Sequence, residues 1–324
     1  MKKKLLLGIV SSALFLWLAS RGIDWSQFGQ ALARTRWIYL VPAVFFTMLG
    51  HFSRSLRWKY MMDPIKRCGI RPLWSATAIA FMVNNLLPAR LGELVRAFVI
   101  GRSQHVSRSA SFATIVYERV VDVFVLILLL WFCMVHISGP EWLSRSAVIL
   151  VAFNIALFFL LFAMVRWRER FRVLIARVVR PFPHETQRRM HDAADAFVTG
   201  LGVVTKPKAS LPIALLSVVV WGCAILGVWF CLIAFRLSLP PMASLMILVL
   251  VSLGSMIPSA PAFLGTLQYA CVVALGLYGI DRAHALAFSA VYHATQFLPI
   301  TATGLYYAWG AHLHWRELTE GRLT

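Results

Sequence analysis

Six stretches of the chain are almost continuously apolar and long enough, or nearly so, to cross a membrane. They are residues 5–19, 37–53, 109–135, 146–165, 211–235 and 284–310. A helix needs about 20 apolar residues to span the roughly 30 Å of hydrocarbon in a bilayer, so we expect six spanning helices. The first stretch is short and follows Met-Lys-Lys-Lys, as in a signal peptide that ends near Ala19. An uncleaved first span is favoured, because more apolar segments follow and no clean small-x-small cleavage site does.

Two further apolar regions are interrupted by Pro, Gly, Asn or Ser. They are PLWSATAIAFMVNNLLPARLGELVRAFVIGR at 72–102 and ASLMILVLVSLGSMIPSAPAFLGTLQYACVVALGLYGI at 243–280. The arm before the first break has about 15 residues, or roughly 22 Å of helix, which is short for a crossing. Irregular backbone at membrane depth needs protein or a water-filled cavity around it. We therefore expect two re-entrant helical hairpins. Their predicted breaks are at Pro88, Gly92, Pro258, Pro261 and Gly265.

The two breaks have similar sequences. Residues 88–97 read PARLGELVRA and residues 261–270 read PAFLGTLQYA, with six of ten positions identical. The placement of basic residues makes the first hairpin open to the cytoplasm and the second to the opposite side, so the flanking spans run in reversed directions. This predicts an inverted-topology repeat, with repeat one at about 37–135 and repeat two at about 211–310. Many secondary transporters have this architecture and bind substrate near the midplane, at the repeat interface.

Composition and charge support a membrane protein. Hydrophobic residues make up 60% of the chain, and the mean hydropathy is +0.73. A net charge of +19 could indicate nucleic-acid binding, but with the N-terminus inside only six of the 32 Lys and Arg residues face the opposite side. These six are Arg21, Arg34, Arg36, Arg145, Arg236 and Arg282. The positive-inside rule therefore predicts a plasma (inner) membrane protein with both termini cytoplasmic. Its basic surface should face anionic lipid headgroups, with no nucleic acid as partner.

The sizeable polar segment at 166–209 is predicted to be a cytoplasmic connector. Phe171, Leu174, Ile175 and Val178 recur at helical spacing between arginines, which favours an amphipathic helix on the membrane surface. The proline pair in Pro181-Phe-Pro183 should end this helix, and a second short helix should follow. A plain basic linker is the alternative.

Charged residues at membrane depth cost at least about 2.5–3.5 kcal/mol each, so they need partners or a function. One group, on the returning arm of the first hairpin, is Arg90, Glu93 and Arg96, spaced so that Glu93 can reach both arginines. A second group, on the 109–135 span, is Glu118, Arg119 and Asp122. Glu118 and Asp122 share a helix face and repel, so at least one needs a cation or a proton. Arg90 or Arg96 across the hairpin could supply the positive charge. A cavity for a charged lipid headgroup and a structural ion-pair cluster that pins the hairpin are both consistent with this pattern.

Neutral polar residues accompany the second hairpin and the last span. Candidates for binding or transport are Asn84, Asn85, Gln268, Tyr292 and His293. The asparagines can cap the first break, and a lone histidine in a span is more often a hydrogen-bonded packing residue than a ligand. The stretch HFSRSLRWKYMM, with Arg54, Arg57 and Trp58, is interpreted as interfacial anchoring, with headgroup capture as the alternative.

No cofactor or metal is expected. The five cysteines are scattered and show neither a metal-ligand spacing nor a disulfide framework. The sequence has no Walker A motif, so ATP is not the expected energy source.

Four stretches in this order carry a family resemblance: RSLRWKYMM, NNLLPARLGELVRAFVI, ATIVYERVVDVFVLILL and PSAPAFLGTLQYA. They resemble the flippase-like integral membrane domain of lysylphosphatidylglycerol synthases, a domain that also occurs in stand-alone proteins of about this length. The resemblance implies a protein that moves a lipid between leaflets. The synthase domain of the fused family members does not follow in this sequence, so a separate lipid-synthesising enzyme is an expected partner.

The resemblance also bears on individual residues. Glu93, Arg96, Glu118, Arg119 and Asp122 fall on the family motif. His293 stands where the family often has an arginine, and this departure puts a lysyl lipid headgroup in doubt.

Three functions are consistent with the sequence. The leading hypothesis is a translocator, not an enzyme, for a phospholipid or a polyprenyl-phosphate-linked lipid, with a polar cleft between opposed hairpins. The second is an intramembrane headgroup transferase or hydrolase that uses Glu118 and Asp122 as acid and base. The third is a non-transporting accessory subunit of a lipid synthase.

Overall fold

The computed structural model describes residues 2–87, 91–136, 141–205, 207–257 and 260–310. Within these ranges the regular structure is helical and no strand occurs, which confirms the all-α fold class. Pro88, Arg90, Pro258 and Ser259 lie outside the described residues.

Six long helices cover the six apolar stretches. They are α1 (Lys2–Ser20), α3 (Leu40–Met62), α6 (Arg108–His136), α7 (Glu141–Arg166), α10 (Pro207–Ala234) and α13 (Arg282–Gly310). Helix α3 has 23 residues, or roughly 35 Å at 1.5 Å per residue, and so exceeds the hydrocarbon thickness. By length and composition alone, Ala209–Ala234 qualifies as a span, and a second span results if Val151–Arg166 and Arg168–Val179, bent by 97°, count together.

Each predicted hairpin is a pair of shorter helices. The first consists of α4 (Ile70–Leu86) and α5 (Gly92–Gln104). The second consists of α11 (Pro241–Met256) and α12 (Thr266–Gly276), with the short 3-10 helix η4 (Pro261–Phe263) between them. The 17 residues of α4 give roughly 26 Å of helix, which is less than a full crossing.

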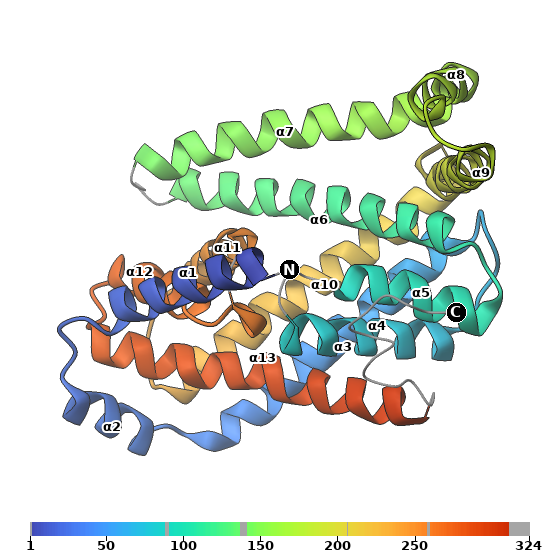
Figure 1. The fold of residues 1–324 in the computed structure, drawn as a ribbon. Coiled ribbons are helices and arrows are strands. Elements are labelled where there is room, and N and C mark those ends of the chain that lie inside the picture. The colour runs from blue at the N-terminus through green and yellow to red at the C-terminus, as the bar shows by residue number, and fades with distance from the viewer. Residues whose placement is uncertain (1, 88–90, 137–140, 206, 258–259, 311–324) are drawn as a thin grey trace.

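The connector also forms two helices, α8 (Arg168–Val179) and α9 (His184–Gly200), separated at the two prolines as predicted. The 3-10 helix η3 (Leu201–Thr205) then leads to α10. Figure 1 shows α8 and α9 at one end of the side-by-side pair α6 and α7, while the other helices form a second group.

Helix α2 (Trp25–Ala33) was not expected from the apolar pattern. It begins after Asp24, whose Oδ1 accepts the backbone N–H of Ser26 at 2.8 Å. A carboxylate at this position satisfies a backbone donor that the first turn leaves without an intrahelical partner. A 3-10 turn, η1 (Trp37–Tyr39), joins α2 to α3.

Helices α3 and α10 pack against each other along their length and run antiparallel. Near one end, the backbone N–H of Arg36 donates to the carbonyl oxygen of Ala234 at 2.8 Å. Near the other end, Arg57 Nη1 donates to Ser217 Oγ at 2.9 Å. The later residues of α3 therefore meet the earlier residues of α10, so the two helices that precede the hairpins point in opposite directions.

The packing of the two halves corresponds helix by helix. Helix α3 contacts α4, as α10 contacts α11, and within each hairpin the two arms contact each other. The second arm then packs on the following long helix, α5 on α6 in the first half and α12 on α13 in the second.

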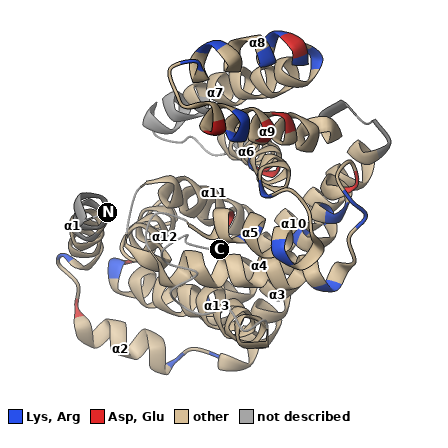
Figure 2. Ribbon diagram, turned by 45° about the vertical axis from the view of Figure 1, so that its right-hand side comes forward, with Lys and Arg blue, Asp and Glu red and all other residues tan. Residues whose placement is uncertain are grey.

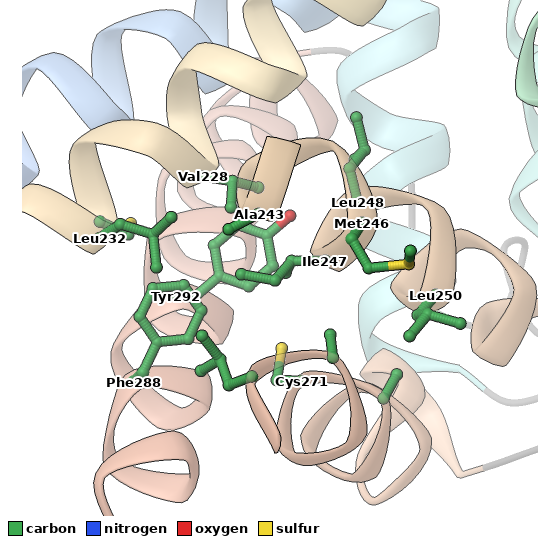
Figure 3. Packing of buried hydrophobic residues seen from close by; sticks show 14 of the residues in the cluster. Val228, Leu232, Ala243, Met246, Ile247, Leu248, Leu250, Cys271, Phe288 and Tyr292 are labelled. Carbon is green, nitrogen blue, oxygen red and sulfur yellow. The ribbon is translucent and has the colours of Figure 1, made fainter. Parts of the chain in front are cut away.

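Two apolar clusters hold these helices together. The larger one joins α10, α11, α12 and α13, and Figure 3 shows Val228, Leu232, Ile247, Cys271 and Tyr292 converging in it. The rings of Phe288 and Tyr292 are stacked with centroids 5.9 Å apart. The second cluster, which includes Trp58, Met61 and Phe98, packs around the first hairpin and α6.

Candidate functional site

Two carboxylates on α6 form the centre of a buried ion-pair cluster. Glu118 and Asp122 lie four residues apart and therefore share one helix face. Their side chains are 0% and 9% exposed. Carboxylates at this depth require cationic partners.

Helix α3 supplies two of these partners. Arg57 Nη1 lies 2.8 Å from Asp122 Oδ1, and Arg57 Nη2 lies 3.3 Å from Glu118 Oε1. Arg54, one turn earlier, places its Nη1 2.9 Å from Asp122 Oδ2. Arg57 thus bridges the two carboxylates.

The first hairpin supplies a third partner from α5. Arg96 Nη1 lies 2.8 Å from Glu118 Oε2, and its side chain is 3% exposed. The guanidinium sits 3.9 Å above the ring of Trp58, which is fully buried. This cation–π contact fixes the plane of the guanidinium and supports its charge in a water-poor setting. The predicted ion pair between Arg96 and the α6 carboxylates is confirmed.

Arg119 is the fourth arginine and the exposed member of the cluster. Its Nη2 lies 3.0 Å from Glu118 Oε1 and 3.5 Å from Asp122 Oδ2, while 40% of the side chain remains exposed. An anion that approaches the cluster can therefore reach Arg119 first.

The cluster carries more positive than negative charge, with four arginines on two carboxylates. Several guanidinium nitrogens are buried without a hydrogen-bond partner in the described structure: Nε and Nη2 of Arg96, Nε and Nη2 of Arg57, and Nε of Arg119. On Arg96 these two atoms form one edge of the guanidinium, the fork that binds two oxygens of a phosphate or carboxylate. One carboxylate oxygen, Asp122 Oδ1, also has no hydrogen bond, but like Arg57 Nη2 it takes part in an ion pair of the cluster. The edge of Arg96 formed by Nε and Nη2 therefore remains the clearest unused donor pair among the described residues.

The interpretation of Arg57 and Trp58 as interfacial anchors is wrong. Both side chains are 0% exposed, and α3 continues to Met62, beyond the expected end at residue 53. The physical reason is that α3 lies between α10 and α6, so this turn faces the carboxylates of α6 instead of the membrane surface. Three-residue spacing of His51, Arg54 and Arg57 was the signal that could have indicated one polar helix face.

Glu93 has a different partner from the predicted one. Among the described residues, its carboxylate oxygens lie 3.4 and 3.5 Å from Asn84 Nδ2, while Arg96 forms its ion pair with Glu118. A pair between Glu93 and Arg90 lies outside the described residues.

The two hairpins close their breaks with the same device. The backbone N–H of Gly92 donates to Asn84 Oδ1 at 2.8 Å, and that of Gly265 donates to Gln268 Oε1 at 2.7 Å. In each case a side-chain amide satisfies a donor at the start of the second arm. Gly265 has φ +88°, a conformation that disfavours other residues. The predicted capping role of Asn84 is confirmed, and Gln268 has the corresponding role in the second hairpin.

The remaining predicted site residues lie on α13 or contact it. Asn85 Nδ2 donates to Thr301 Oγ1 at 2.8 Å, which joins the first hairpin to α13. His293 Nδ1 lies 3.0 Å from Gln268 Nε2, so this histidine has a hydrogen-bonded partner in the second hairpin. Tyr292 is 4% exposed and packs in the larger apolar cluster (Figure 3).

A cavity of about 200 Å³ lies between the two hairpins. Its wall combines α4, α11, η4, α12 and α13 with one residue of α3, His51. Its polar lining residues are His51, Asn85, Ser252, Ser255, Tyr292, His293 and Gln296. His51 precedes Arg54 by one helical turn, so this cavity adjoins the ion-pair cluster.

The exterior of the long helices is apolar. Large exposed side chains occur along α6, α7 and α10, among them Trp131, Phe153, Phe159, Leu211 and Val218. Figure 2 shows Lys, Arg, Asp and Glu gathered on α8 and α9, while α11, α12 and most of α13 have few charged positions. Extensive exposed apolar surface of this kind needs a lipid environment.

An all-helical bundle with an apolar exterior and ion-paired charges inside is the form of a helical integral membrane protein. The chain belongs to the family described as lysylphosphatidylglycerol synthase TM region, which matches residues 5–304. It is also 25% identical over 316 residues to a UPF0104 membrane protein of Methanothermobacter thermautotrophicus, with 93% of this chain and 92% of the relative covered. A UPF0104 membrane protein of Methanocaldococcus jannaschii is 25% identical over 222 residues, which cover 68% of this chain and 91% of the relative.

Proposed function

We propose that this protein is a lipid translocator that moves an anionic phospholipid or a polyprenyl-phosphate-linked lipid between leaflets. The observation that carries the proposal is the unpaired, buried edge of Arg96, formed by Nε and Nη2, inside a cluster with excess positive charge. A phosphate is the lipid group that matches such an edge, because it accepts two parallel N–H bonds from one guanidinium.

The ion pairs explain how the cluster could bind an anion reversibly. Each carboxylate is already ion-paired with several of the arginines, so their guanidinium groups are held in place before a ligand binds. The partly exposed Arg119 would make the first contact, and the phosphate would then pass to the buried edge of Arg96. Glu118 and Asp122 would stay paired with the arginines when the phosphate binds. The phosphate would therefore join the cluster without breaking its ion pairs.

The correspondence of the two halves supports a transport mechanism. Helices α3 and α10 are antiparallel, and each half repeats the same order of helix contacts. We propose that these halves form an inverted repeat with both termini cytoplasmic, and that α4–α5 and α11–α12 enter the membrane from opposite sides. Rocking of one half against the other would open the cavity between the hairpins to each leaflet in turn.

The enzyme hypothesis and the accessory-subunit hypothesis make different predictions. Both candidate catalytic carboxylates are held by arginines, and no contact among the described residues favours either as an acid or base. The function is therefore tested by leaflet exchange of labelled lipids in proteoliposomes, with mass analysis of the lipids afterwards. Exchange of chemically unchanged anionic lipid above protein-free vesicles supports the proposal. Altered lipid would indicate an enzyme, and no exchange of any anionic, zwitterionic or polyprenyl-phosphate lipid, with or without a proton gradient, would indicate an accessory role.

A further inference from the structure

The first helix lies against the break of the second hairpin, although it precedes both hairpins in the sequence. Ser12, in the middle of α1, is 5% exposed, and its Oγ accepts the backbone N–H of Ala260 at 2.7 Å. The backbone of α1 also comes very close to Gly265, because a Cβ atom added there would collide with the carbonyl oxygen of Ser12. One residue of α1 therefore contacts both ends of the segment 260–265.

The backbone of this segment is strained. Ala262 and Phe263 have φ values of +59° and +58°, and Gly265 has +88°. The left-handed region suits glycine but is unfavourable for Ala and Phe, and such residues persist only where surrounding contacts hold them there. Without an outside restraint, we expect the backbone at Ala262 and Phe263 to relax toward the right-handed or extended region.

The strained segment forms part of the wall of the cavity between the hairpins. Ala262 and Phe263 both line this cavity, and η4, which contains them, packs against α4 of the first hairpin. The conformation of η4 therefore sets the shape of the cavity where the two hairpins meet.

Further contacts keep α1 in place along the second hairpin. Helix α1 packs on α12 and α13 (Figure 1), and the ring of Phe15 lies 5.5 Å from that of Tyr269 on α12. Just beyond the end of α1, the carbonyl oxygen of Arg21 accepts a hydrogen bond from Arg282 Nη1 at 3.1 Å. These contacts fix the position of Ser12 relative to the break.

We propose that α1 is a strap that holds the break of the second hairpin in its strained, cavity-lining conformation, with Ser12 as the positioning residue. The inference does not depend on the proposed function, because it concerns the conformation of residues 260–265 alone. Release of α1 would let Ala262 and Phe263 relax and would change the cavity wall. Cleavage of a signal peptide near Ala19 would remove the strap, so the inference requires that the mature protein retains α1.

The test is hydrogen–deuterium exchange of the full-length protein in lipid nanodiscs, measured on peptides that cover residues 260–268. Ser12→Ala should raise their exchange rate about fivefold, the effect of one net hydrogen bond, and leave peptides from α4 and α5 unchanged. Ser12→Thr retains the hydroxyl and should exchange as the wild type does. Ser20→Ala is the matched control, because the Ser20 hydroxyl donates to the carbonyl oxygen of Trp17 within the same helix.

A second substitution tests the strain. Ala262→Gly accepts the positive φ without steric cost, so it should slow the exchange of residues 260–268. Combined with Ser12→Ala, it should bring the rate back close to that of the wild type.

Three results would overturn the inference. The first is an unchanged exchange rate of residues 260–268 in Ser12→Ala, or an equal rise in α4 and α5. The second is faster exchange in Ala262→Gly, which would show that this segment is not strained. The third is an intact mass of the purified wild-type protein that lacks the residues of α1.

Discussion

Arg57 on α3 and Asp122 on α6 are joined by an ion pair of 2.8 Å between Nη1 and Oδ1, with the arginine fully buried. The same guanidinium also faces Glu118, so one residue of α3 holds both carboxylates of α6. Since arginines outnumber carboxylates in this cluster, loss of a carboxylate should be more damaging than loss of an arginine.

We therefore expect Glu118→Gln to destabilise the protein by about 3–5 kcal/mol, because it leaves buried guanidinium groups without a counter-charge. Arg57→Gln should have a smaller effect, since Glu118 keeps Arg96 and Arg119, and Asp122 keeps Arg54. The two destabilisations are compared by thermal unfolding in detergent, with the fraction of protein that stays monodisperse as the readout. Asp192→Asn, at an exposed position on α9, is the matched control. A smaller shift for Glu118→Gln than for Arg57→Gln would contradict this charge balance.

The glycine at the start of α5 should not accept a side chain. A Cβ atom at Gly92 would collide with the carbonyl oxygen of Ala80 and with the Asn84 side chain, which fix the distance between the hairpin arms. We expect Gly92→Ala to lower the folded yield strongly. Gly222→Ala, in the middle of α10 with nothing within 4 Å of the added atom, should be neutral or stabilising by about 0.5–1 kcal/mol. Similar yields for the two variants would show that the arms are not packed this closely.

The contact between α8 and α9 should be insensitive to pH over the neutral range. The Arg172 guanidinium donates to both oxygens of Asp195, at 2.7 and 2.8 Å, and lowers the pKa of that carboxyl below its usual 3.8. A lowered carboxyl pKa stabilises the folded state above the unfolded pKa, and the contribution is lost as the pH falls through the folded pKa. The protection of α9 against hydrogen exchange, corrected for the intrinsic exchange rate at each pH, should therefore be constant from about pH 8 to pH 5 and fall only below about pH 4. Asp195→Asn should show the lower protection from about pH 8 to pH 5 and approach the wild type at the lowest pH, and a transition of the wild type near pH 6 would refute the assignment.

The predicted orientation can be tested by labelling in intact cells. Arg34 and Arg67 are exposed and lie on opposite sides in the proposed topology, and the five native cysteines are buried. We expect a membrane-impermeant maleimide to label Arg34→Cys in intact cells, and Arg67→Cys only after permeabilisation. The reversed pattern would place the N-terminus outside and would overturn the orientation drawn from the positive-inside rule.

Continuous apolar runs predicted the long helices well, because an apolar run of about 20 residues is what a helix in a bilayer requires. The paired break sequences also indicated Gly92 and Gly265 as break residues, and the second arms begin at Gly92 and directly after Gly265. Helix α2 was missed, since its nine residues are too short and too polar to stand out, although Asp24 followed three residues later by Gln27 is a capping signal.

The composition of the ion-pair cluster could be predicted only in part. The sequence indicated Arg96, Glu118 and Asp122, because charges within apolar helices are conspicuous. It did not indicate Arg57, which stands near the end of an apolar stretch and reads equally well as an anchor. Its burial depends on the packing of α3 between α6 and α10, and that long-range contact has no local signature.

Leaflet exchange in proteoliposomes shows whether a lipid phosphate uses the unpaired edge of Arg96 during transfer. Arg96→Gln removes the fork while Glu118 keeps Arg57 and Arg119 as partners, and Arg67→Gln is the matched control at an exposed site. We predict at least about tenfold slower exchange of anionic lipid for Arg96→Gln, as expected for loss of a charge-assisted bidentate contact, and an intermediate rate for Arg96→Lys. The control should exchange at the wild-type rate. Wild-type exchange by a correctly folded Arg96→Gln protein would show that the lipid phosphate does not use Arg96, and the cluster would then have a structural role alone.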